Sequence, residues 1–109
     1  KEGSAMTITG DGEQTRDFTH VRDVAAAVMA AATKDTVGAG EVLNIGAGTQ
    51  TSINELASMI GTETEHIEAR LEPRHTMADI SKTTELLGWK PTVTLEDGIA
   101  ELKKEFGLL

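Results

Sequence analysis

Glycine-rich turns divide this chain into short units, and their spacing limits what it can fold into. Gly10-Asp11-Gly12, Gly38-Ala39-Gly40 and Gly46-Ala47-Gly48 are strong turn signals, and Gly61 and Gly88 stand where apolar runs stop. Between these turns, short β-prone runs alternate with helical patterns. We therefore expect a small α/β fold with short, partly parallel strands and about four helices.

Four runs are expected to be extended. They are Met6–Thr9, Arg16–Val21, Glu41–Ile45 and His66–Leu71. The third run contains Val42, Leu43 and Ile45, which predict a buried strand.

Periodicity and capping predict the first two helices. Residues 23–33 are rich in alanine, and Val24 and Val28 lie four positions apart on one helical face. Ser52 and Glu55 have the spacing of a capping box, in which each side chain satisfies a backbone donor near the other residue. That box predicts a second helix that begins after Ser52 and closes at Gly61.

The last two helices are predicted from similar signals near the C-terminal end. Asp79 or Ser81 can cap a helix that runs to Leu87 and ends at Gly88. The final helix starts after Thr94, and its apolar stripe consists of Leu95, Ile99, Leu102 and Phe106.

Composition narrows the class of protein. A length of 109 residues is typical of one domain, and with three aromatic residues the core must be mainly aliphatic. The net charge of −8 argues against nucleic-acid and membrane-surface binding, which need a basic face. Cysteine is absent, which excludes disulfides and thiolate chemistry, and no signal peptide or membrane span is visible. The default expectation is a cytoplasmic protein.

The turn at Gly46-Ala47-Gly48 superficially imitates a dinucleotide-binding loop. It follows an expected strand and precedes a capped helix, and Glu68 lies roughly twenty residues further on. The third glycine of that fingerprint is missing, because Thr51 occupies its position. We therefore favour a plain strand-to-helix turn.

Two polar segments are candidates for binding an anion. Arg16 can project a guanidinium from a rigid strand, with Asp17 beside it to orient it, and a planar guanidinium suits a diphosphate. The second segment contains Arg70, Glu72, Arg74 and His75. Taken alone, the first segment is more commonly a turn followed by a charged edge strand, and the second is better explained as a solvated loop. His20, His66 and His75 show no metal-ligand spacing, so we interpret them as structural or surface residues.

Three segments together resemble the extended short-chain dehydrogenase/reductases. Residues 8–24 (ITGDGEQTRDFTHVRDV) resemble their run GDG-x-Q-x-R-D-F/Y-x-x-V-x-D-V. Residues 42–46 (VLNIG) resemble their Y/L-N-I-G strand, and 78–91 resemble their A-D-x-S-K … L-G-W-x-P ending. Order and spacing agree over essentially the whole chain. Within this group, the UDP-glucose 4-epimerase-like enzymes are most similar.

The resemblance implies that residues 1–109 are the C-terminal substrate-binding domain of an NAD-dependent nucleotide-sugar epimerase or dehydratase. The family's glycine-rich NAD loop and catalytic Tyr-x-x-x-Lys belong to an N-terminal Rossmann domain, and this chain contains no tyrosine. No catalytic, cofactor-binding or metal-binding residue is therefore expected here.

The same resemblance assigns roles to residues that would bind an NDP-sugar, with UDP favoured. Arg16 matches the family's arginine on the substrate diphosphate, and Glu72 matches the acidic position of an R-x-G-D/E motif associated with the ribose. Leu71 replaces the motif's glycine. Arg70 reaches the motif's arginine only with a one-residue deletion, and Arg74 could substitute for it.

Several alternatives stay open at this stage. The chain could come from a 4,6-dehydratase, or be a free-standing nucleotide- or protein-binding module without catalysis. The expected partners are the NDP-sugar and the Rossmann domain of the same parent chain. Apolar surface left without that domain could also support a homodimer.

Overall fold

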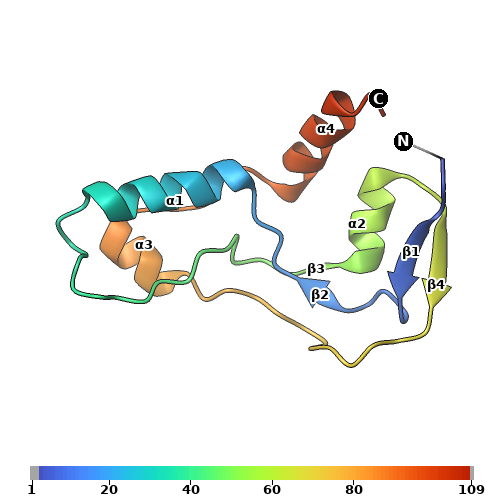
Figure 1. The fold of residues 1–109 in the computed structure, drawn as a ribbon, viewed down its shortest axis with the longest axis horizontal. Coiled ribbons are helices and arrows are strands. Elements are labelled where there is room, and N and C mark those ends of the chain that lie inside the picture. The colour runs from blue at the N-terminus through green and yellow to red at the C-terminus, as the bar shows by residue number, and fades with distance from the viewer. Residues whose placement is uncertain (1–2, 109) are drawn as a thin grey trace.

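The computed structural model describes residues 3–108, which form an elongated lobe measuring 48 × 34 × 16 Å (Figure 1). Its elements are β1 (Met6–Thr9), β2 (Thr15–Arg16), α1 (Val21–Thr33), β3 (Thr51–Ser52), α2 (Ile53–Ile60), β4 (Thr64–Ile67), α3 (Ser81–Leu87) and α4 (Leu95–Glu105). The expected α/β class with short strands and four helices is confirmed for this part of the chain. None of these helices is long and apolar enough to cross a membrane.

Two small sheets organise one half of the lobe. Strand β1 runs parallel to β4, with Met6 opposite Thr64, and buries Ile8. Strand β2 pairs antiparallel with β3, and an isolated bridge joins Thr15 to His75. Figure 1 shows β1, β4 and α2 at one end of the molecule, α1 and α3 at the other, and the β2–β3 pair between them.

Local sequence signals account for most helix ends. The predicted capping box of α2 is present, since Glu55 N donates to Ser52 Oγ at 3.1 Å and Ser52 N donates to Glu55 Oε2 at 2.8 Å. Gly61 and Gly88 adopt left-handed conformations and close α2 and α3, as glycine does most easily. Thr94 caps α4 through the Asp97 amide.

The core beneath α1 is small and is completed by a buried carboxylate. Ala27 of α1 packs with Leu87 and Trp89, and further aliphatic side chains surround this cluster. Asp23, also on α1, accepts hydrogen bonds from the Thr92 and Val93 amides, both at 3.0 Å, and from the Thr92 hydroxyl at 2.8 Å. The Trp89 indole donates to the Asp23 carbonyl oxygen at 3.0 Å. These bonds tie the segment after α3 to the first turn of α1.

The predicted strand at Glu41–Ile45 is wrong. The segment has no ladder partner among residues 3–108, and the Val42 side chain is 81% exposed. Side chains from α3 bind its carbonyl oxygens instead: Lys82 Nζ donates to Val42 at 3.2 Å, and Thr83 Oγ1 donates to Asn44 at 2.6 Å. Leu43 and Ile45 do pack against the core, so the apolar pattern indicated partial burial rather than strand pairing.

Three other boundaries differ from the predictions. The extended run expected over 16–21 is a strand only at Thr15–Arg16, because His20 Nδ1 accepts the Arg22 amide and starts α1 at Val21. The strand expected over 66–71 is β4, which ends at Ile67.

The start of α3 also differs. Its N-cap residue is Ile80, so neither Asp79 nor Ser81 occupies the cap position. The Asp79 side chain nevertheless accepts the Ser81 amide at 3.0 Å, and thus satisfies a donor of the first turn from one residue further out.

Candidate functional site

Arg16 is held at the end of a short strand in the middle of the lobe. Strand β2 pairs with β3, and the Thr15 backbone also exchanges hydrogen bonds with the segment around Arg74 and Thr76. The Arg16 guanidinium donates through Nη1 to the Thr15 carbonyl oxygen at 2.7 Å and through Nη2 to Glu72 Oε2 at 2.9 Å. The strand therefore fixes the backbone of Arg16, and two hydrogen bonds fix the direction of its side chain.

Glu72 lies in the loop after β4 and meets Arg16 across 56 positions of sequence. Its two carboxylate oxygens have different partners, since Oε2 accepts Arg16 and Oε1 accepts Gln14 Nε2 at 3.3 Å. The structure thus brings together Arg16 and Glu72, to which the family resemblance assigns the diphosphate and the ribose. A guanidinium beside a carboxylate offers donors for phosphate oxygens and an acceptor for hydroxyl groups.

Gln14 is the member of this cluster that sequence reasoning missed. Its side chain is only 7% exposed, and Nε2 also donates to the Thr9 carbonyl oxygen at 2.8 Å. The signal was present, because Gln14 is the glutamine of the run GDG-x-Q-x-R-D. Its contact with Glu72 depends on how a distant loop folds back, and no local pattern predicts that.

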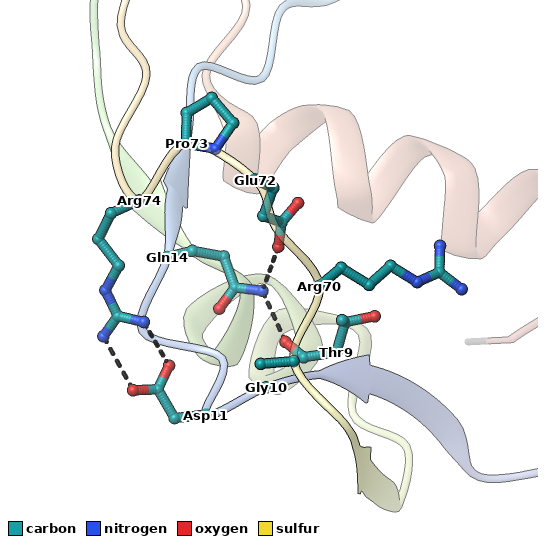
Figure 2. A pocket seen from close by; sticks show the side chains of 9 residues that line it. Thr9, Gly10, Asp11, Gln14, Arg70, Glu72, Pro73 and Arg74 are labelled. Atoms are coloured by element: carbon teal, nitrogen blue, oxygen red, sulfur yellow. Dashed lines mark hydrogen bonds and ion pairs between the residues drawn. The ribbon is translucent and has the colours of Figure 1, made fainter.

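Figure 2 shows a cavity of about 350 Å³ beside this cluster, and both Arg70 and Arg74 line it. Its walls come from the end of β1 with the following turn, from Gln14, and from the loop after β4. The Arg70 side chain is extended away from Arg74, and it makes no hydrogen bond or ion pair with any residue of 3–108. Arg70 is therefore the cation of this cavity that is free to accept a ligand.

Arg74 is already paired. Its Nη1 and Nη2 atoms donate to the two oxygens of Asp11, both at 2.8 Å, in a fork-on-carboxylate arrangement (Figure 2). The Arg74 hydrogen bonds, together with the Glu13 amide, lower the pKa of Asp11 to about 2, and the same pair raises the pKa of Arg74. Two of the five guanidinium N–H groups of Arg74 are therefore already donated, and its charge is paired with Asp11.

The Asp11–Arg74 pair makes a prediction about acid stability. The pKa of Asp11 is about 2 in the folded chain, against a usual value of 3.8. The ionised Asp11 therefore stabilises the fold fully above pH 3.8, and this contribution is lost as the pH falls toward 2. In Arg74→Ala, the Asp11 pKa should rise toward 3.8 in an NMR titration of the side-chain carboxyl. Arg70→Ala is the matched control and should leave the titration unchanged. An Asp11 pKa that does not move in Arg74→Ala would contradict the pairing.

Asp17 does not orient Arg16, and that expectation is wrong. Its carboxylate accepts three backbone amides instead, from Ala47 at 2.9 Å, Gly48 at 3.0 Å and Ala78 at 3.1 Å. A side chain at Gly46 would collide with Ala78 and Asp17, at 2.4 and 2.7 Å from an added Cβ. Asp17 therefore joins two loops, and glycine is required where they meet.

The same contacts decide how the Gly46-Ala47-Gly48 turn is interpreted. A dinucleotide-binding loop needs free amides to approach a pyrophosphate. Here the Ala47 and Gly48 amides are already donated to Asp17, so this turn does not fit NAD. The segment is a turn, but not the expected strand-to-helix turn, because residues 41–45 form no strand.

The three histidines make structural contacts. His20 caps α1, His66 Nδ1 lies 2.7 Å from the Gly10 carbonyl oxygen, and His75 Nδ1 lies 2.9 Å from Thr15 Oγ1. Within residues 3–108, no group of three or more histidine or carboxylate side chains is arranged to hold a metal ion.

Comparison with known proteins gives the fold a context. The family model of GDP-mannose 4,6 dehydratase matches residues 1–102. A UDP-glucose 4-epimerase of Mycolicibacterium smegmatis is 37% identical over 111 residues, which cover 95% of this chain and 35% of that protein. UDP-glucuronic acid decarboxylase 1 of Arabidopsis thaliana is 31% identical over 105 residues, covering 93% of this chain and 24% of the relative.

Solved structures agree with the sequence relatives. The UDP-glucuronic acid 4-epimerase of Bacillus cereus, solved with UDP-glucuronic acid and NAD, superposes with a TM-score of 0.86 at 38% identity. That match covers 96% of this chain and 37% of the epimerase. The chain spans about a third of the length of the curated relatives that it matches first.

The fold is thus that of a part of an extended short-chain dehydrogenase/reductase. Within that class, the chain belongs to the NAD-dependent nucleotide-sugar epimerase and dehydratase family.

Proposed function

We propose that residues 1–109 are the C-terminal substrate-binding domain of an NAD-dependent UDP-sugar epimerase, here called the parent enzyme. The observation that carries this proposal is the ion pair between Arg16, at the end of β2, and Glu72, 2.9 Å apart. Glu72 lines the cavity of Figure 2, and Arg16 lines a separate hollow with Gly46 and Ala78. Arg16 binds the diphosphate of the sugar nucleotide, and Glu72 accepts hydrogen bonds from the ribose. Solved relatives that hold UDP-glucose and UDP-glucuronic acid support a nucleotide sugar as the ligand.

The geometry suits this ligand chemically. The planar guanidinium of Arg16 can donate two charge-assisted hydrogen bonds to phosphate oxygens, and its strand setting limits the entropy lost on binding. Arg70 can supply a second positive charge without breaking an ion pair within residues 3–108. Arg74 is the weaker candidate for that role because Asp11 already occupies its guanidinium.

The reaction of the parent enzyme is a reversible hydride transfer between NAD and the hexose C4 of the bound sugar. This chain has no tyrosine for a Tyr-x-x-x-Lys pair, and its Gly46-Ala47-Gly48 turn does not fit NAD. The cofactor and the base therefore come from an N-terminal Rossmann domain of the parent. We expect the 109-residue chain alone to be catalytically inactive.

One comparison favours a second candidate reaction. The matching family model is named for a 4,6-dehydratase, which makes a dehydratase the alternative parent. Both reactions share the diphosphate-binding role of this lobe, so Arg16 and Glu72 keep the same functions in either case.

Calorimetry on the isolated chain tests the proposal against a free-standing binding module. Titrations with UDP, a UDP-sugar and NAD should give weak binding for the uridine nucleotides and no detectable heat for NAD, because one wall of the cleft belongs to the absent domain. Tight and specific binding of any of the three by the chain alone would favour the module.

The apolar outer face of α1 supports a missing partner domain. Ala27 faces the core, yet Val21 and Val28, roughly 100–120° around the helix from it, are 74% and 61% exposed. A helix that is apolar on both sides is normally buried on both sides. We propose that the Rossmann domain of the parent covers this face, together with the exposed Val42.

Without that domain, the chain should self-associate or bind a hydrophobic dye. Val28→Lys should reduce both effects in sedimentation and dye-fluorescence measurements, with the midpoint of unfolding little changed. Ala26→Lys is the matched control, since a position two residues away lies on the opposite side of the helix. A monomer that binds no dye would contradict the proposed covered face.

A further inference from the structure

Gln14 is fixed at both its backbone and its side chain. Its carbonyl oxygen accepts the Ile53 amide at 3.1 Å, which ties it to the start of α2. Its buried Nε2 donates one hydrogen bond to the Thr9 carbonyl oxygen at 2.8 Å and another to Glu72 Oε1 at 3.3 Å (Figure 2). The Gln14 amide therefore joins the end of β1 to the loop that carries Glu72.

That loop is anchored on its C-terminal side by Arg74, which binds Asp11, and by the bonds of Thr15 to the backbone around it. Glu72 lies between β4 and the isolated bridge at His75, in a stretch without regular structure, and the preceding Leu71 is fully exposed. Glu72 divides its carboxylate between Gln14 on Oε1 and Arg16 on Oε2. Gln14 therefore helps to orient the Glu72 carboxylate, which is one of the two acceptors that direct the Arg16 guanidinium; the other is the Thr15 carbonyl oxygen.

We propose that Gln14 is a positioning residue that acts through Glu72 to orient Arg16 for the nucleotide sugar. The inference rests on the proposed function of Arg16 and Glu72. A glutamine suits this place chemically, because its amide has two hydrogens for two acceptors and carries no charge. An ionised carboxylate at this position would have no hydrogen to donate to the Thr9 carbonyl oxygen or to Glu72. An apolar side chain would likewise leave these two acceptors without a donor.

The test is a double-mutant cycle in the full-length parent enzyme. Gln14→Met keeps length and volume but removes the donor, and should raise the KM for the UDP-sugar about tenfold with kcat and NAD affinity little changed. In a Glu72→Gln background, the same Gln14→Met change should alter KM less than about twofold, because the residue through which it acts is already changed. Gln50→Met is the matched control, since Gln50 is exposed and makes no hydrogen bond within residues 3–108.

A second variant covers the case in which Gln14→Met fails to fold. Gln14→Glu has nearly the same shape, and its carboxyl can donate only while protonated. Its KM relative to wild type should therefore rise with pH as the introduced carboxyl ionises beside Glu72, and a purely structural role would give no such profile. If the KM of Gln14→Glu stays equal to that of the wild type over the pH range in which the new carboxyl ionises, the proposal is overturned. Equal effects of Gln14→Met on KM with Glu72 and with Gln at position 72 would also overturn it.

Different results would contradict the binding role of Arg16 and the positioning role of Gln14. If Arg16→Ala leaves the affinity for the UDP-sugar unchanged, the proposed function is wrong. If Arg16→Ala and Glu72→Gln weaken binding but Gln14→Met does not, only the positioning role of Gln14 is wrong.

Discussion

Arg16→Ala in the parent enzyme is expected to weaken binding of the UDP-sugar by roughly 30- to 150-fold. A lost hydrogen-bond partner for a charged group costs about 2–3 kcal/mol, and each 1.4 kcal/mol corresponds to about a factor of ten in affinity. The effect is large because the backbone at position 16 is fixed in β2, so no other side chain can move in to replace the missing guanidinium. Calorimetry with the intact enzyme and a UDP-sugar measures the change directly.

Two further variants locate the cause of that loss. Arg16→Lys keeps the charge but not the planar fork, so it should recover only part of the affinity. Arg22→Ala removes an exposed arginine that pairs with Glu101 and lines neither the cavity of Figure 2 nor the hollow at Arg16, so it should leave the affinity unchanged. NAD affinity should be the same in all three variants. Unchanged UDP-sugar affinity in Arg16→Ala would exclude the role assigned to Arg16.

Asp23→Ala is expected to produce the largest loss of stability. Burial alone raises the pKa of Asp23, but hydrogen bonds from Val93 and Thr92 outweigh it and hold the pKa below the usual value. Removing the carboxylate leaves three donors without a partner at the junction of α1 and the segment after Trp89. We expect a loss on the order of 3 kcal/mol, a large fraction of the typical stability of a small domain.

Denaturant unfolding of the chain measures that loss. Asp35→Ala is the matched control, because Asp35 is exposed and makes no hydrogen bond within residues 3–108, and it should change the free energy of unfolding by less than about 0.5 kcal/mol. Because the pKa of Asp23 is lowered in the folded state, its contribution holds at neutral pH and declines as the pH falls below the usual carboxyl range. Equal stabilities for the two variants at neutral pH would refute this role.

The helices could be predicted from sequence because their signals are local. Each cap acts within one turn of the helix end that it defines: Ser52 with Glu55 for α2, Gly88 for α3 and Thr94 for α4. Strand pairing depends on distant partners instead. The apolar run at 41–45 has the composition of a strand, but no strand lies beside it within residues 3–108.

In the candidate site too, some residues could be predicted from the sequence and others could not. The resemblance to a known family placed Arg16 and Glu72 in one site, and the structure finds them in contact. The partners of Gln14 and Arg74 lie 58 and 63 positions away, so no spacing in the sequence indicates them. Asp17 was misjudged because it adjoins Arg16 in the chain. It lies just beyond β2, and its carboxylate binds backbone amides 30, 31 and 61 positions away.

A crystal structure of the parent enzyme with a bound UDP-sugar tests the central claim most directly. We predict that the Arg16 guanidinium lies within hydrogen-bond distance of the diphosphate and that Glu72 accepts a hydrogen bond from the ribose. A diphosphate bound elsewhere, with Arg16 contacting only Glu72 and Thr15, would contradict the assignment of this lobe as the nucleotide-sugar site.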